Sequence, residues 1–332
     1  MNIKQTKQAI RAYLAADIPV MIWGAPGIGK SQAMQQVARD EYGGRMLTYR
    51  LNLLESVDLR GLPHVTADGV QWAVPDMIAE LRQFPADLPC VLFLDEVNTA
   101  TPAVMAAAMQ LVLDRQIGPH KLPGNVKITA AGNRQKDRAS ANRTPTAFNN
   151  RFAHIEAEPD AGELKEYGEA NNWSPLAIAF LAFRPNLIHV MPQDDSPAFP
   201  TPRSWESASK MIDAPEATRP QLIRGLVGQA AASEFEYFLQ AWRHVPRLAD
   251  ILADPEGTPV PDASQPALLY AVAVQVAGAA TRQNIDTLAR YIGRLPKEHQ
   301  VVVMVDCTKR DKSLMQTAAF VAWCAANSDV QT

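Results

Sequence analysis

Residues 24–31 read Gly-Ala-Pro-Gly-Ile-Gly-Lys-Ser. This stretch fits the phosphate-binding loop pattern G-x-x-x-x-G-K-[ST] at every position. The apolar run Val20–Trp23 before it predicts a short buried strand, and residues 32–38 after it predict a helix. Such a turn binds anions, because glycines let the backbone approach phosphates and the helix N-terminus presents partial positive charge. The sequence therefore predicts a site for a nucleoside triphosphate.

The last residues of the loop have separate expected tasks. Lys30 is expected to reach the β- and γ-phosphates, and the Ser31 hydroxyl is expected to bind Mg²⁺. The residues expected to contact the nucleotide are Gly24, Ala25, Pro26, Gly27, Ile28, Gly29, Lys30, Ser31 and Gln32. The alternative is a chance glycine turn. The Lys-Ser pair and the flanking strand and helix argue against it.

Composition places the chain among soluble globular proteins. At 332 residues, two domains are expected, and 47% hydrophobic with 20% charged residues is ordinary for such a protein. The net charge of −3 gives no overall attraction to nucleic acid or to an anionic membrane, although a local basic patch is compatible with it.

Cysteine usage indicates a reducing compartment. Cys90, Cys307 and Cys324 are far apart and show no C-x-x-C spacing, which argues against disulfides and against a zinc site. The most apolar stretch, Ala267–Ala280, is shorter than the ~20 residues of a membrane span and predicts a buried helix. We therefore expect a cytoplasmic protein without a membrane span.

The order of predicted elements changes near residue 158. Before it, strands alternate with helices, which predicts a parallel sheet covered by helices on both faces. The predicted strands are Val20–Trp23, Arg45–Leu51, Val91–Leu94, Val126–Ala131 and Phe152–Ala157. The predicted helices between them are Lys4–Ala16, Ser31–Glu41, Met77–Phe84 and Ala103–Asp114. Residues 1–158 are thus expected to form an α/β nucleotide-binding domain.

Residues 159–332 are expected to be helical. Two proline-rich connectors, Met191–Pro202 and Asp254–Pro266, interrupt them, because proline cannot continue a helix. The predicted helices are Gly162–Asn171, Pro202–Asp213, Pro220–Trp242, Ala267–Thr281, Arg282–Arg294, His299–Cys307 and Ser313–Ala326.

Two carboxylates follow the apolar run Val91–Leu94. Asp95 and Glu96 lie where a buried strand ends, and burying carboxylates there is costly unless they have a function. In a phosphate-loop protein the first carboxylate holds Mg²⁺ and the second activates the attacking water, so we assign Asp95 to the metal and Glu96 to the general base. The alternative is a strand that ends in a solvated acidic turn.

Asn133 follows the next predicted strand. An amide at the carboxyl end of a strand lies where open α/β sheets bind ligands, so it is placed to contact the γ-phosphate or the attacking water. An asparagine that starts a turn is an equally good interpretation of this residue alone.

Taken together, these motifs resemble AAA+ ATPases of the MoxR-like group. The resemblance covers residues 1 to about 235, while residues 236–332 carry no motif of the group. It rests on residues 24–31, on Phe-Leu-Asp-Glu-Val-Asn at 93–98, on Thr-Ala-Ala-Gly-Asn-Arg at 129–134, on Asn-Arg-Phe at 150–152 and on Thr-Pro-Arg-Ser at 201–204. It implies an α/β P-loop NTPase fold with a parallel five-stranded sheet flanked by helices, an all-helical lid and a C-terminal helical extension.

The resemblance also implies roles for three polar residues. Asn133 would be the first sensor, which aligns the attacking water. Arg203 would be the second sensor, which reaches the γ-phosphate from the lid, and Arg151 would be the arginine finger that acts on the nucleotide of a neighbouring subunit. Such a finger is worth ~10³–10⁵ in rate.

Each arginine also has a simpler interpretation. Arg151 is alternatively a surface charge or an ion-pair partner of Glu156 or Glu158, and Arg203 alternatively solvates its helix. Other nearby arginines compete for the finger role, namely Arg134, Arg138 and Arg143.

Two hairpin insertions are implied as well. Residues 59–72 predict two short strands around an Ala-Asp-Gly turn, at the position where this group inserts a hairpin that often faces a central pore. Trp72 either is exposed there and grips a partner protein or packs under the hairpin, and we favour packing. Residues 116–125 correspond to a second hairpin.

The sequence therefore predicts Mg²⁺-dependent ATP hydrolysis that remodels a partner protein. The resemblance implies a homo-oligomeric ring, commonly a hexamer, and a partner with a von Willebrand factor A domain. One alternative is a nucleic-acid motor or loader, against which the net charge of −3 argues. Another is a nucleotide-dependent scaffold that does not hydrolyse ATP.

Overall fold

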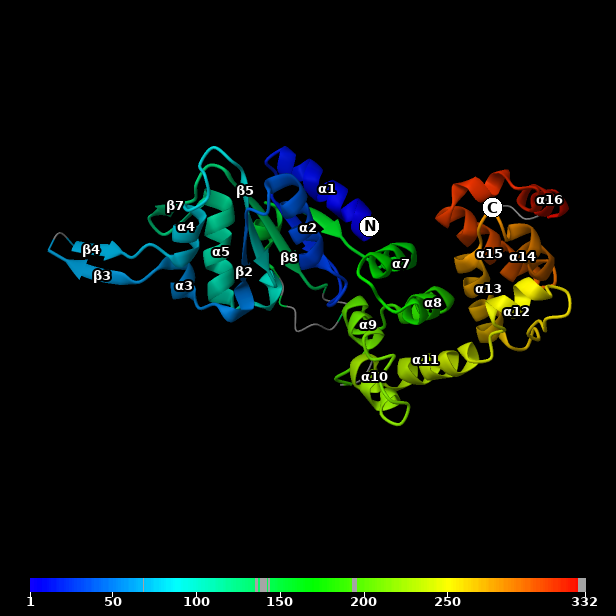
Figure 1. Ribbon diagram of the computed structural model, residues 1–332. Coiled ribbons are helices and arrows are strands. Elements are labelled where there is room, and N and C mark those ends of the chain that lie inside the picture. The colour runs from blue at the N-terminus through cyan, green and yellow to red at the C-terminus, as the bar shows by residue number, and fades with distance from the viewer. Residues whose placement is uncertain (68, 135–136, 138–141, 143, 193–195, 328–332) are drawn as a thin grey trace. The chain divides into compact units, whose positions relative to one another are not determined.

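The structure, a computed structural model, describes residues 1–67, 69–134, 137, 142, 144–192 and 196–327. The chain divides into one unit of Met1–Tyr167 with Ile188–Ser207 and another of Gly168–Leu187 with Ala208–Thr332 (Figure 1). The first unit contains the sheet, and the second is helical. The predicted domain boundary at residue 158 stays a prediction.

Within the described residues, five parallel strands form the main sheet in the order β2-β5-β8-β1-β9. The strands are β1 (Val20–Trp23), β2 (Met46–Arg50), β5 (Cys90–Asp95), β8 (Val126–Gly132) and β9 (Ala153–Glu156). Every residue of β5 is buried, as expected for a central strand with helices on both faces. The predicted α/β arrangement, with this sheet and a helical C-terminal region, is confirmed.

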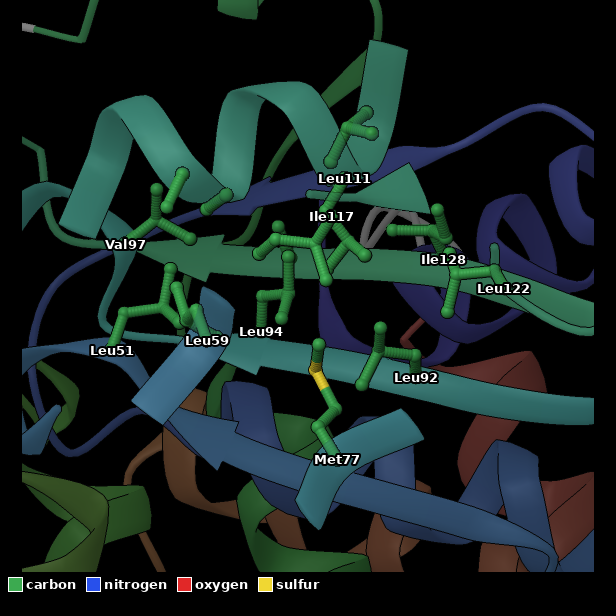
Figure 2. Close-up of a cluster of buried hydrophobic side chains, with 14 of the residues drawn as sticks. Leu51, Leu59, Met77, Leu92, Leu94, Val97, Leu111, Ile117, Leu122 and Ile128 are labelled. Carbon is green, nitrogen blue, oxygen red and sulfur yellow. The ribbon is translucent and has the colours of Figure 1, made fainter. Parts of the chain in front are cut away.

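Alternate side chains of β5 pack into two different hydrophobic cores, one on each face of the sheet. Val91 and Phe93 pack on the face covered by helices α1 (Ile3–Ala15) and α2 (Lys30–Tyr42). Leu92 and Leu94 pack on the opposite face, which the helices α3 (Ser56–Arg60), α4 (Asp76–Leu81) and α5 (Pro102–Asp114) cover (Figures 1 and 2). The two-residue period of a strand therefore anchors both helical layers to one strand.

Two hairpins project from the first unit. Strand β3 (Pro63–Thr66) pairs antiparallel with β4 (Gly69–Trp72), and β6 (Gln116–Ile117) pairs with β7 (His120–Lys121), so both predicted hairpins are confirmed. All residues of β4 are exposed, and Trp72 retains 40% exposure. The expectation that Trp72 packs under the hairpin is therefore wrong, because the hairpin extends away from the sheet (Figure 1).

The remaining helices differ from the predicted ones at specific points. A continuous helix over Pro220–Trp242 is wrong, because Gly228 adopts a φ of +81° that ends one helix before the next begins. The predicted helix Ser313–Ala326 is split at Thr317 into a 3₁₀ turn and a helix. The elements are α6 (Thr146–Asn149), α7 (Ala161–Ala170), α8 (Pro175–Phe183), α9 (Pro202–Ser209), α10 (Arg219–Val227), α11 (Gln229–Trp242), α12 (Leu248–Ala253), α13 (Pro266–Ala279), α14 (Ile285–Ile292), α15 (Lys297–Arg310), η5 (Lys312–Gln316) and α16 (Ala318–Ala326).

The apolar stretch predicted to be a buried helix forms α13, which packs with α14 and α15 in the core of the second unit. In the described part of the chain, no helix is long and apolar enough to cross a membrane.

Candidate active site

The glycine-rich loop connects β1 to α2 and requires its glycines. Gly27 and Gly29 have φ of +78° and +96°, a backbone region that favours glycine. A Cβ atom at Gly24 would lie 2.8 Å from the Ala157 carbonyl oxygen, and one at Gly27 would lie 2.9 Å from Thr201 Cβ. Helix α2 begins at Lys30, so its N-terminus opens directly on the loop. The loop thus has the local geometry of an anion site.

Lys30 lies at the centre of the site. Its ammonium donates to the carbonyl oxygens of Gly24 (2.8 Å) and Ala25 (3.0 Å) and to Asn133 Oδ1 (2.9 Å). Burial lowers the pKa of Lys30 to about 8, and the nearby carboxylates, Asp95 first among them, oppose that shift. Phosphate groups would stabilise the charged ammonium further.

Ser31 and Asp95 bring two oxygen ligands together. The Ser31 hydroxyl donates to Asp95 Oδ2 at 2.7 Å, and Asp95 is only 7% exposed at the end of β5. A hydroxyl and a carboxylate are ligands that Mg²⁺ accepts, usually alongside water and phosphate oxygens. The pair predicted to bind the metal is therefore adjacent, and its donor set fits that ion.

Glu96 has a strained backbone. Its φ of +55° and ψ of +38° are left-handed, which for a residue with a side chain costs on the order of 1–3 kcal/mol. Its amide donates to Asp95 Oδ1 at 3.0 Å, and its carbonyl accepts from the Thr99 hydroxyl at 2.9 Å. These contacts hold a half-buried carboxylate next to Asp95, where the sequence predicted the general base.

Asn133 lies at the carboxyl end of β8, between β5 and β1 in the sheet. Through Lys30 its side chain joins the loop, so the ends of three neighbouring strands form one site. A turn residue facing only solvent would not make this contact. Asn133 therefore lies beside the loop lysine, and its contact with the γ-phosphate or the attacking water stays a prediction.

A further polar residue, Asn98, was quoted with the acidic motif but received no predicted role. Its side chain is 1% exposed and bonds both backbone groups of Asn133, with Nδ2 to the carbonyl at 2.6 Å and the Asn133 amide to Oδ1 at 3.0 Å. The available sequence signal was an amide two residues after a carboxylate pair.

The segment that includes α9 contacts the loop. The Arg203 amide donates to the Gly27 carbonyl at 3.3 Å, and the Arg203 side chain is exposed. His189, for which the sequence predicted no role, has Nε2 3.3 Å from the Pro26 carbonyl oxygen. Burial lowers the pKa of His189. Gln32, by contrast, has its side-chain amide bonded to the Tyr167 hydroxyl at 2.6 Å.

The arginines near the finger position differ in their partners. Arg134 is 14% exposed and pairs with Asp137 at 2.8 Å and with Glu158 at 3.0 Å. Arg151 is exposed and forms no ion pair within the described residues. Glu156 also forms an ion pair with Arg134, at 3.9 Å. The acidic residues that were the alternative partners of Arg151 thus face Arg134.

Two remaining candidates for the finger, Arg138 and Arg143, lie outside the described residues.

The solved structures that this chain matches have low sequence identity to it. The structure of NtrX from Brucella abortus in complex with ADP is 14% identical with a TM-score of 0.42, and the match covers 96% of this chain and 65% of that one. Its complex with ATP has the same identity and TM-score, with 96% and 64% covered. This chain thus spans about 65% of the length of the NtrX chains. A RuvB mutant from Thermotoga maritima is 17% identical with a TM-score of 0.41, covering 82% and 80%.

Comparison with curated proteins gave no match. Comparison with protein families matched residues 19–152 to the AAA domain (dynein-related subfamily). The matched segment begins just before β1, contains the loop, Asp95, Glu96 and Asn133, and ends one residue after Arg151. Residues 19–152 of this chain are therefore similar to AAA domains of the dynein-related subfamily.

Proposed function

We propose that this protein hydrolyses ATP in a Mg²⁺-dependent reaction at the carboxyl ends of β5, β8 and β1. The observation that carries the proposal is the pair of contacts Lys30–Asn133 and Ser31–Asp95. They join the phosphate-loop lysine, the expected metal ligands and the first-sensor position in one site. Glu96 next to Asp95 supplies the base that a non-hydrolysing scaffold does not need.

Each residue of the site has a different proposed role in the reaction. Lys30 and the loop amides bind the phosphates, and Ser31 and Asp95 hold the metal ion. When bound, Mg²⁺ neutralises charge that develops on the phosphate oxygens. Glu96 accepts a proton from the attacking water, and Asn133 orients that water.

We further propose that the chain works as a ring and that it is related in function to the MoxR-like group. Arg151 supports the ring, because an exposed arginine without an ion-pair partner in the described part of the chain is free to reach a neighbouring subunit. We propose a hexamer, with Arg203 as the second sensor and Arg151 as the finger. The location that we propose is the cytoplasm, which the unpaired Cys90, Cys307 and Cys324 support.

We propose that hydrolysis drives the remodelling of a partner protein that contains a von Willebrand factor A domain. Support comes from the apolar hairpin, the name we give to β3 and β4. Its register places Pro63, Val65, Val70 and Trp72 on one face. Val65 is 86% exposed and Val70 62% exposed. An apolar face of this kind marks a protein-binding surface.

Phosphate release with and without Mg²⁺ tests the proposed reaction. We expect release only with Mg²⁺ and ATP, with a rise in molecular mass to that of a ring on adding ATP. ATP binding without release would instead indicate a scaffold. Release stimulated by DNA with a steep salt dependence would instead indicate a nucleic-acid motor.

A further inference from the structure

We propose that Asn98 is a positioning residue, which fixes Asn133 in the orientation that catalysis requires. This inference deepens the proposed ATPase function and rests on it. Asn98 bonds the backbone groups of Asn133, whereas the Asn133 side chain is the part expected to contact the nucleotide or the water. It acts through Asn133, whose two backbone groups it holds.

Asn98 holds Asn133 on both sides of its Cα atom. The amide nitrogen of Asn98 donates to the Asn133 carbonyl at 2.6 Å, and its oxygen accepts from the Asn133 amide at 3.0 Å. With both backbone groups fixed, the Asn133 side chain moves only by rotation about its own bonds. Its Oδ1 atom is in turn bonded to Lys30 Nζ.

The main chain does not provide these bonds at this point of the sheet. The register between β5 and β8 ends at Leu94 and Ala130, so the ladder between these strands does not reach Asn133. The Asn98 amide substitutes for the missing strand neighbour. It packs so closely that a Cβ atom at Gly132 would lie 2.8 Å from Asn98 Oδ1. Gly132 thus admits the amide.

The same turn carries the general base. Asn98 belongs to the 3₁₀ turn η2 (Val97–Thr99), which begins directly after Glu96. A rigid connection between Glu96 and Asn133 fixes the distance between the base and the group that orients the water. The Asn98 carbonyl also accepts from the Asn142 amide at 2.7 Å, which anchors the turn from the other side. Displacement of such groups by even 1 Å can cost about 10² in rate.

A double-mutant cycle tests the assignment. Asn98→Ala is expected to lower kcat per nucleotide-bound site by about 10- to 100-fold while the Kd for ATP changes by less than about threefold. Asn133→Ala should have a similar effect, and the double variant should be no slower than the slower single variant. Multiplying effects, or an unchanged kcat in Asn98→Ala, would overturn the proposal.

Asn125→Ala is the matched control. Its side-chain amide also donates to backbone carbonyls, of Pro85 at 2.9 Å and Leu88 at 2.6 Å, but it lies just before β8, at the opposite end from Asn133. We expect its kcat per nucleotide-bound site to equal that of the unmodified protein. An equal loss in both alanine variants would mean that Asn98 is merely structural.

A nearly isosteric variant guards against misfolding. Asn98→Asp keeps the acceptor for the Asn133 amide but sets a carboxylate oxygen against the Asn133 carbonyl. Protonation of that carboxyl restores a donor, so the ratio of variant to unmodified rate should rise as pH falls. Taking the ratio removes the pH effects that both proteins share. A ratio independent of pH would contradict the proposal.

Hydrogen exchange separates this inference from the proposed reaction. If the unmodified protein releases no phosphate, the ATPase proposal fails, and exchange at the Asn133 amide still tests the positioning. We expect that amide to exchange faster in Asn98→Ala than in Asn125→Ala. Equal exchange in the two variants would overturn the role of Asn98 whatever the activity.

Discussion

Lys30 Nζ donates a hydrogen bond to Asn133 Oδ1 at 2.9 Å. The two residues are far apart in the sequence and come together because β1 and β8 are neighbouring parallel strands. Since burying a lysine is costly, each acceptor around it offsets part of that cost. The contact therefore orients the ammonium and connects the loop to the residue that follows β8.

The Glu96→Gln variant is expected to separate ATP binding from ATP hydrolysis. The amide cannot accept a proton from water, so we expect turnover to fall by about 10²–10⁴-fold. ATP affinity should change by less than about threefold, because the carboxylate is not expected to hold the phosphates. Phosphate release and ATP-binding titrations measure the two effects. Full turnover in this variant would refute the assignment of the base.

Glu234→Gln serves as the control. Glu234 pairs with Arg184 on the surface of the helical unit, with 41% of its side chain exposed. We expect the loss of this exposed pair to leave turnover unchanged.

Ser31→Ala tests the metal site. Loss of the hydroxyl next to Asp95 should raise the Mg²⁺ concentration for half-maximal turnover by about tenfold or more. Removal of Mg²⁺ with a chelator should stop turnover in all variants. Ser233→Ala, which removes an exposed hydroxyl from α11, should leave the Mg²⁺ dependence unchanged. An unaltered Mg²⁺ dependence in Ser31→Ala would remove this residue from the metal site.

Local motifs made the phosphate site predictable. The loop residues are consecutive, and Asp95 and Glu96 directly follow an apolar run, so their positions required no knowledge of long-range packing. The contact between Asn98 and Asn133 was not predictable in this way. It depends on the register of β5 against β8, in which Leu94 lies beside Ala130, and on the direction of the turn after Glu96.

The prediction of some helix boundaries was wrong for similar physical reasons. Glycine occurs inside helices as well as at their ends, and only the φ of Gly228 shows that it ends α10. Helix α8 is apolar on all sides, so it gave no periodic signal. The exposure of Trp72 could not be predicted either, because an apolar strand pattern does not reveal whether a covering layer exists.

The lowered pKa of His189 predicts a pH-dependent stability. Because burial keeps the folded pKa below the unfolded value of about 6.5, the unfolded chain takes up the proton first as pH falls. Stability contributed by the neutral ring is thus present above that value and is lost as pH decreases through it. The charges of Lys30 and Arg134 also lower the pKa of His189. The neutral ring lies within hydrogen-bond distance of the Pro26 carbonyl oxygen.

His189→Gln provides the measurement, since an amide keeps a donor for Pro26 but does not titrate. Thermal unfolding of both proteins at pH 7.5 and at about pH 5.5 should show a larger decrease in Tm for the unmodified protein. Shifts that are equal in the two proteins would show that His189 makes no contribution.

The apolar hairpin should be dispensable for folding. Because Val65 and Trp72 are exposed, replacing either with serine should change the free energy of unfolding by no more than about 0.5 kcal/mol. Leu59→Ala, at a fully buried position beside the hairpin, should cost about 2–5 kcal/mol. Basal ATP hydrolysis should persist in both serine variants, while capture of a von Willebrand factor A domain protein is lost. Unfolding of these variants would show that the hairpin belongs to the core.

Arg151 is expected to act across a subunit boundary. Arg151→Ala should hydrolyse ATP about 10³–10⁵-fold more slowly, because its neighbour loses charge stabilisation in the transition state. Arg39→Ala, which removes an arginine with 76% side-chain exposure on α2, should retain its activity. Lys30→Ala subunits should be inactive alone, since they cannot bind phosphate, but they still carry Arg151. Mixing the two inactive variants should therefore restore part of the phosphate release. If mixed assemblies form, as mass measurement would establish, and remain inactive, Arg151 does not act on a neighbour's nucleotide.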